Sequence, residues 1–150
     1  MTTPLIVTNE IDIDAPAKKV WAALTEPGWT KQYMFGCVPV TDWKPGSPLL
    51  WKGVFNGAEI VAVKGQVVSI DPEKSLIYTV IDPNNPAIPD LPQNYLTVTI
   101  RLAEQDGKTH LFVSQGDYNG VADGENRYKH TVDGGGWSPI LDQIKQLVEK

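Results

Sequence analysis

The 150-residue sequence predicts one α+β domain, residues 1–150, in which a curved antiparallel sheet of about six to seven strands surrounds a C-terminal helix. A chain of this length buries roughly two-thirds of the surface that it exposes when unfolded, which suffices for one hydrophobic core. Three observations predict the class. Apolar and polar residues alternate along several segments, turn signals separate those segments, and a stripe with helical spacing ends the chain.

A strand and two short helices are expected near the start of the chain. Residues 5–14 alternate between apolar and polar side chains, the two-residue period of a half-buried strand. Pro16 suits the first position of a helix, and the next residues place four apolar side chains on one helical face: Ala17, Val20, Trp21 and Leu24. This helix should end near Pro27-Gly28. The four-residue spacing of Trp29 and Tyr33 then predicts a second short helical segment before Gly36.

The middle of the chain has the pattern of antiparallel strands joined by turns. Asn56-Gly57, between residues 49–55 and 59–70, is typical of a tight hairpin. A further turn at residues 71–74 precedes a segment that is apolar in both phases, so we expect the strand at 76–81 to be covered on both faces or nearly so. Residues 95–102 and 109–115 alternate clearly and predict two more strands.

An amphipathic helix is expected at the end of the chain. Its apolar stripe comprises Trp137, Ile140, Leu141, Ile144, Leu147 and Val148. Residues 125–132 could form the first part of this helix, but three glycines at 134–136 each cost a helix about 1 kcal/mol relative to alanine, so we expect a bend there. Because one helix cannot fill the whole concavity of a bent sheet, a pocket is expected in the concavity, especially beneath the two short helices.

Composition and charge argue against several classes of function. The single cysteine, Cys37, cannot form an internal disulfide, and a net charge of −5 with scattered Lys and Arg does not suit nucleic acid as a partner. Residues 1–9 lack a signal-peptide pattern and no apolar run is long enough for a membrane span, so we expect a cytoplasmic protein. A homodimer is possible, but the sequence does not decide it.

Three segments resemble a known family over nearly the whole chain. They are IDIDAP at 11–16 with VWAALTEP at 20–27, GQVVSIDP at 65–72 with LIYT at 76–79, and GW at 136–137 with the apolar stripe of the last helix. Together they resemble the START-like (SRPBCC) proteins and, more narrowly, homologues of the activator of the heat-shock chaperone (Hsp-ninety) ATPase. The resemblance implies a helix-grip fold, in which the curved sheet wraps a long C-terminal helix.

The resemblance implies three classes of function. Members of the superfamily typically bind a small hydrophobic or aromatic molecule in a deep apolar cavity, and this non-enzymatic role is the leading hypothesis. Some members are polyketide cyclases or aromatases, for which Tyr78, Arg127 and His130 would supply the polar groups. A chaperone-linked interaction module is the third possibility, although the chaperone-activating role belongs to eukaryotic members with an additional domain.

The sequence offers little for catalysis or for a metal, so we expect no catalytic residue, no metal site and no cofactor. His110 and His130 stand in no nucleophile or metal-ligand motif, and His110 should face solvent because its phase is opposite to that of Leu111. Cys37 has no neighbouring base in the sequence and is expected to be a small residue that is buried or half-buried. His130 could instead provide a polar contact to a ligand, or it could simply face solvent.

The candidate ligand-binding residues are mostly the aromatic side chains that the expected elements turn inward. They are Trp21, Tyr33, Phe35, Trp51, Phe55, Tyr78, His130, Trp137 and Leu141. Burying one such ring is worth about 1.5 to 3 kcal/mol, so core packing alone could also explain each of them. The assignment of Trp51 and Phe55 depends on strand register, because a shift by one residue would turn both to solvent.

A proline-rich segment at residues 83–92 has a proline at every third position. This period suits an extended polyproline II conformation, which a partner domain could recognise. Alternatively, the segment is a stiff connector between strands or a flap over the pocket. The sequence leaves the two roles open.

Overall fold

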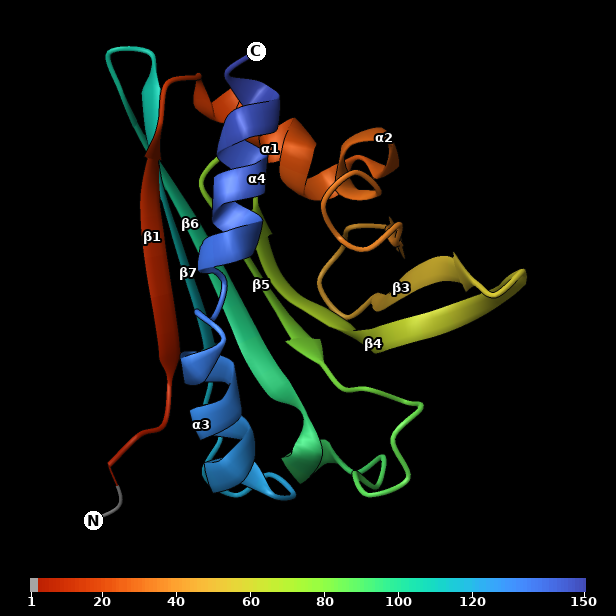
Figure 1. The fold of residues 1–150 in the computed structure, drawn as a ribbon. Coiled ribbons are helices and arrows are strands. Elements are labelled where there is room, and N and C mark those ends of the chain that lie inside the picture. Colours follow the sequence, from red (N-terminus) through yellow and green to blue (C-terminus); the bar gives the residue numbers. More distant parts are fainter. Residues whose placement is uncertain (1–2) are drawn as a thin grey trace.

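A seven-stranded antiparallel sheet organises the computed structural model, which describes residues 3–150 (Figure 1). The strand order is β1-β7-β6-β5-β4-β3-β2. The strands are β1 (Val7–Ile13), β2 (Val38–Val40), β3 (Pro48–Phe55), β4 (Ala58–Asp71), β5 (Ser75–Val80), β6 (Leu96–Gln105) and β7 (Lys108–Gly116). The helices are α1 (Ala17–Thr25), α2 (Pro27–Thr30), α3 (Gly124–Asp133) and α4 (Ser138–Val148), with a 3₁₀ turn at Pro92–Asn94. The α+β class and the helix-grip topology are therefore confirmed.

The core lies between the sheet and α4, and the strand periodicity produces it. Along β6 the side chains of Leu96, Val98, Ile100 and Leu102 are buried, while those of the alternate phase are half-buried or exposed. From α4, Leu141 and Ile144 are buried against them, as the apolar stripe predicts. Figure 1 shows α4 lying across the hollow side of the sheet, with α1 beside it.

The sheet bends because its longest strand carries irregularities. Asn56 and Gly57 both have positive φ, as a two-residue type I′ hairpin requires, and they join β3 to β4 as expected. Register shifts occur between Trp51 and Lys52 in β3 and between Val67 and Ser69 in β4. Such bulges bend a strand and increase its twist. The β3–β4 hairpin consequently curls away from the rest of the sheet (Figure 1).

The C-terminal helix is broken where the glycines predict a bend. Helix α3 ends at Asp133, and α4 begins after Trp137. Gly135 and Gly136 have positive φ, which ends one helix and reorients the chain into the next. The three-residue strand β2 was not expected from the sequence, since it is too short to show a period.

The proline-rich segment connects β5 to β6 and is tied to the rest of the fold at several points. Asn84 Nδ2 donates a hydrogen bond to Val61 O at 2.8 Å, and Asp90 forms an ion pair with Lys64. Asn94 is buried; its Nδ2 donates to Pro89 O and its Oδ1 accepts from Ala122 N, both at 2.9 Å. These contacts favour a fixed connector over a free polyproline ligand.

Candidate functional site

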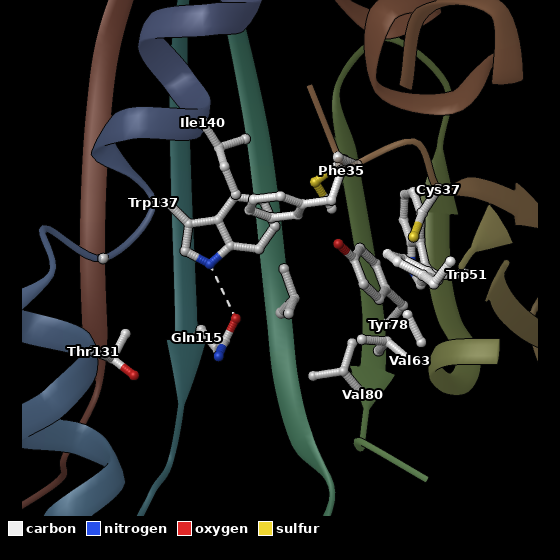
Figure 2. Close-up of a pocket in the computed structure, with 15 residues that line it drawn as sticks. Phe35, Cys37, Trp51, Val63, Tyr78, Val80, Gln115, Thr131, Trp137 and Ile140 are labelled. Carbon is white, nitrogen blue, oxygen red and sulfur yellow. Dashed lines mark hydrogen bonds between the residues drawn. The ribbon is translucent and has the colours of Figure 1, made fainter. Parts of the chain in front are cut away.

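A cavity of about 470 Å³ lies between the start of α4 and the curled half of the sheet (Figure 2). It is lined by Met34, Phe35, Cys37, Trp51, Phe55, Ala62, Val63, Tyr78, Val80, Val98, Gln115, Thr131, Gly136, Trp137 and Ile140. Most of these side chains are apolar, and none of the described residues on its walls carries a charge. Figure 2 shows Trp137 and Gln115 on one side and Trp51, Tyr78 and Val80 on the other.

The strand wall follows directly from the two-residue period of β3. Trp51 and Phe55 lie four residues apart on the same face, and both line the cavity, so the inward register expected for them is the one observed. Trp51 is buried and its ring centroid lies 6.4 Å from that of Tyr78 on β5. This tilted aromatic pair fixes the orientation of the Tyr78 ring.

The helical wall is held in place by hydrogen bonds that Trp137 donates to residues of two strands distant in the sequence. Trp137 Nε1 donates to Gln115 Oε1 on β7 at 3.0 Å, and Trp137 N donates to Asn9 Oδ1 on β1 at 2.9 Å. Gln115 Nε2 in turn donates to Tyr118 Oη at 2.8 Å. The same Tyr118 oxygen lies 3.4 Å from Thr131 Oγ1. The Trp137 ring is therefore a fixed wall of the cavity, and the polar groups that support it are already paired.

Tyr78 is the polar group that remains available. Its side chain is only 3% exposed, and its hydroxyl has no hydrogen-bond partner among residues 3–150. No fully buried polar side-chain atom of the described chain lacks a partner, so this hydroxyl must reach open space, and Figure 2 shows it pointing into the cavity. Burial raises the pKa of Tyr78 well above its usual value, which keeps the phenol protonated.

Phe35 lies at the mouth of the cavity. It is 80% exposed although it is a large aromatic residue, and its φ is +56°. In Figure 2 its ring lies between Trp137 and Tyr78. The segment after α2 holds the Phe35 ring at the apolar opening, where the ring covers part of the entrance.

Five of the nine candidate ligand-binding residues meet at this cavity: Phe35, Trp51, Phe55, Tyr78 and Trp137. The structure places the other four elsewhere. Tyr33 is a core residue whose hydroxyl donates to Ala23 O at 2.6 Å, and Leu141 is buried in the main core. Trp21 is half-buried against the same core, and His130 is exposed on α3.

Sequence reasoning missed the remaining lining residues for two reasons. Gln115 and Thr131 are polar, and Thr131 reaches the cavity only because α3 lies beside the sheet. Ile140 and Val98 are apolar residues that the sequence assigns to the core, without indicating which core positions border empty space. Spacing offered a weak signal for Ile140, which lies three residues after Trp137 on the same helical face.

A second, polar groove of about 450 Å³ adjoins the cavity. Its lining residues are Leu96, Gln115, Tyr118, Asp123, Asn126, Arg127, His130 and Thr131. Gln115 and Thr131 line both spaces, whereas Tyr78 lines only the apolar one. The three polar groups expected for a cyclase-like enzyme, Tyr78, Arg127 and His130, are therefore not assembled in one cavity.

The proline-rich segment does not border the apolar cavity, because no residue of 82–95 contributes to its described walls. Within residues 3–150 there is no cluster of three metal-binding side chains. None of the helices in the same range has the length and apolar character needed to cross a membrane.

Comparison with family models gives one match, described as activator of Hsp90 ATPase homolog 1-like protein, which covers residues 14–149. Comparison with curated proteins gives no match.

Solved structures with a similar fold are numerous. The protein ChR145 from Cytophaga hutchinsonii is 34% identical, with 99% of this chain and 97% of that chain covered and a TM-score of 0.76. MLL2253 from Mesorhizobium loti is 24% identical, with 96% of each chain covered and a TM-score of 0.71. PFC0360w from Plasmodium falciparum, described as an HSP90 activator, is 14% identical, with 96% of each chain covered and a TM-score of 0.68. The last two likenesses show the fold alone.

Proposed function

This chain belongs to the family of activator of Hsp90 ATPase homolog 1-like proteins, and on that basis we propose that its cavity binds a small hydrophobic or aromatic molecule without catalysing a reaction. One observation carries the proposal, namely the apolar cavity of about 470 Å³ between α4 and the curled sheet. Pockets for small molecules in proteins typically measure about 300–1,000 Å³ and are lined mainly by apolar and aromatic side chains.

The chemistry of the walls supports binding over turnover. The cavity walls formed by the described residues include no carboxylate, imidazole or amine that could act as an acid or base at neutral pH. Burial raises the pKa of the Cys37 thiol, which therefore stays protonated and is a poor nucleophile. Burial likewise keeps Tyr78 protonated. The remaining lining groups are suited to contact and not to proton transfer.

A cavity-filling substitution tests the proposal. Ala62 on β4 lines the cavity and is half-buried, so a phenylalanine at this position would occupy space that a ligand needs. The wild-type protein should retain or take up apolar aromatic compounds in native mass spectrometry and melt at higher temperature with them, because a ligand that binds only the folded state stabilises it. Ala62→Phe should lose both effects.

Val54→Phe is the matched control, because Val54 is 69% exposed on the same hairpin and does not line the cavity. It should bind the compounds as the wild type does. A wild-type protein that retains nothing and whose melting temperature never changes across a screen of apolar compounds would contradict the proposal, as would equal binding by Ala62→Phe.

A further inference from the structure

We propose that the ligand is an uncharged molecule with an acceptor oxygen at one end, and that Tyr78 selects it by donating a hydrogen bond to that oxygen. The inference rests on the proposed function and names the chemical class that the cavity takes. It makes Tyr78 a specificity-determining residue.

The hydroxyl of Tyr78 is available to a ligand. Its side chain is 3% exposed, and Oη reaches the cavity without a partner among the described residues. Leaving a buried hydroxyl without an acceptor is unfavourable, so a ligand gains most affinity by placing an acceptor at this position.

The other polar side chains on the walls are already committed. Gln115 uses its oxygen for Trp137 Nε1 and its nitrogen for Tyr118 Oη. The Thr131 hydroxyl donates to Arg127 O at 2.8 Å, closing the helical turn of α3. The Cys37 thiol is a weak hydrogen-bonding group. Polar recognition inside the cavity therefore centres on the hydroxyl of Tyr78.

The lack of charge on the described cavity walls restricts the ligand further. A carboxylate or ammonium group buried there would have no counter-ion, and burying an unpaired charge is far more costly than burying a carbonyl with a hydrogen bond. The cationic Arg127 lies in the adjoining groove, beyond Gln115 and Thr131. A ketone, ester, ether or hydroxyl oxygen thus fits the Tyr78 end, with the apolar body against Phe35 and Trp137 (Figure 2).

Three probes of nearly equal shape test this inference. In 4-acetylbiphenyl, 4-isopropylbiphenyl and biphenyl-4-carboxylate the same apolar body carries a carbonyl, a methyl branch or a charge. Calorimetric titration of the wild type should show 4-acetylbiphenyl binding roughly 3- to 10-fold more tightly than 4-isopropylbiphenyl, the factor expected of one net hydrogen bond. The carboxylate should bind most weakly at pH 7. In Tyr78→Phe the preference for the ketone should disappear, while 4-isopropylbiphenyl binds as before.

Tyr33→Phe is the matched control. Tyr33 is equally buried, but its hydroxyl is bonded to Ala23 O in the core and not in the cavity. This variant should be less stable than the wild type yet keep the preference for the ketone. As a measurement independent of affinity, the infrared C=O stretch of bound 4-acetylbiphenyl should shift to lower frequency in the wild type and return to the unbonded value in Tyr78→Phe.

The outcomes separate the two proposals. Binding of both neutral probes with equal affinity, an unchanged preference in Tyr78→Phe, or tightest binding by the carboxylate would overturn the role of Tyr78 and leave ligand binding intact. If none of the three probes bound, both proposals would be rejected for aromatic compounds of this size.

Discussion

Gly136 occupies a position that a larger residue cannot share. Its φ is +59°, and a Cβ placed on it would lie 2.5 Å from Asn9 Oδ1 and 2.7 Å from Val7 Cγ1. Asn9 Oδ1 is also the acceptor for Trp137 N. The absence of a side chain at Gly136 therefore lets β1 approach closely enough to hold the Trp137 wall of the cavity.

We predict that Gly136→Ala lowers the free energy of unfolding by about 1–3 kcal/mol, because it adds a strained backbone conformation and a contact with Asn9. Urea denaturation followed by circular dichroism measures the change. Gly134→Ala is the control, since its φ is negative and the nearest atom to its Cβ, His130 O, lies 3.5 Å away. Equal stability of the two variants would contradict this account of Gly136.

His110 provides a prediction about pH. It lies on the outer side of the sheet, as its strand phase predicts, with Nδ1 2.7 Å from Asp12 Oδ1 and Nε2 3.3 Å from Glu10 Oε1. The hydrogen bond with Asp12, helped by the charges of Asp12 and Glu10, raises the pKa of His110 above its usual value. Because the folded-state pKa exceeds the unfolded one, the added stability is complete below the unfolded pKa of about 6.5 and is lost as pH rises through the folded pKa.

Asp12→Asn should therefore lower the pKa of His110, as measured by NMR titration of the ring protons, and weaken the loss of stability with rising pH. Asp14→Asn removes the same charge from a residue that has no contact with His110, so the titration of His110 should change little. If Asp12→Asn left the pKa of His110 unchanged, the hydrogen bond with Asp12 would not be what raises this pKa. The side chains are largely exposed, so the effect on stability is small.

At the scale of elements, the connection from β5 to β6 and the start of α3 are coupled through one buried side chain. Asn94 bonds to Pro89 within the connection and to Ala122 before α3. We predict that Asn94→Ala lowers the free energy of unfolding by about 1–2 kcal/mol. The change removes the acceptor of the half-buried Ala122 N–H, whereas Pro89 O keeps its hydrogen bond from Leu91 N. Hydrogen exchange should speed up in both segments at once.

Asn85→Ala is the control for this coupling, because Asn85 Oδ1 accepts only from the nearby Ala87 N. In Asn85→Ala, hydrogen exchange should speed up only within residues 82–95. If Asn94→Ala accelerated exchange in the connection but not near Ala122, the two elements would be independent.

Periodicity predicted those elements that are long enough to show a repeating pattern of apolar and polar residues. The strands at 95–102 and 109–115, the Asn56-Gly57 hairpin and the break at the three glycines all appear as expected. Strand β2 has three residues, too few to show alternation, and its pairing with β3 depends on the β3–β4 hairpin. The hydrogen bonds and the ion pair that hold the proline-rich segment could not be predicted either, because most of them join residues that are distant in the sequence.

At the scale of the whole molecule, the cavity exists because the sheet curls farther than α4 extends. The sequence could predict that Trp51, Phe55, Tyr78 and Trp137 turn inward, because each lies on the apolar face of a periodic element. It could not separate them from Tyr33 and Leu141, which are also apolar and inward but fill the core. That distinction depends on the two bulges in β4, at Ala62 and Val68, whose positions no local pattern reveals.

The placement of Trp51 and Trp137 on facing walls has a practical consequence. Two of the five tryptophans of the chain border the cavity, and the other three do not. A bound chromophore that absorbs in the near ultraviolet would therefore quench the emission of these two indoles first, by resonance energy transfer. The protein thus carries its own optical reporter of occupancy and needs no attached dye.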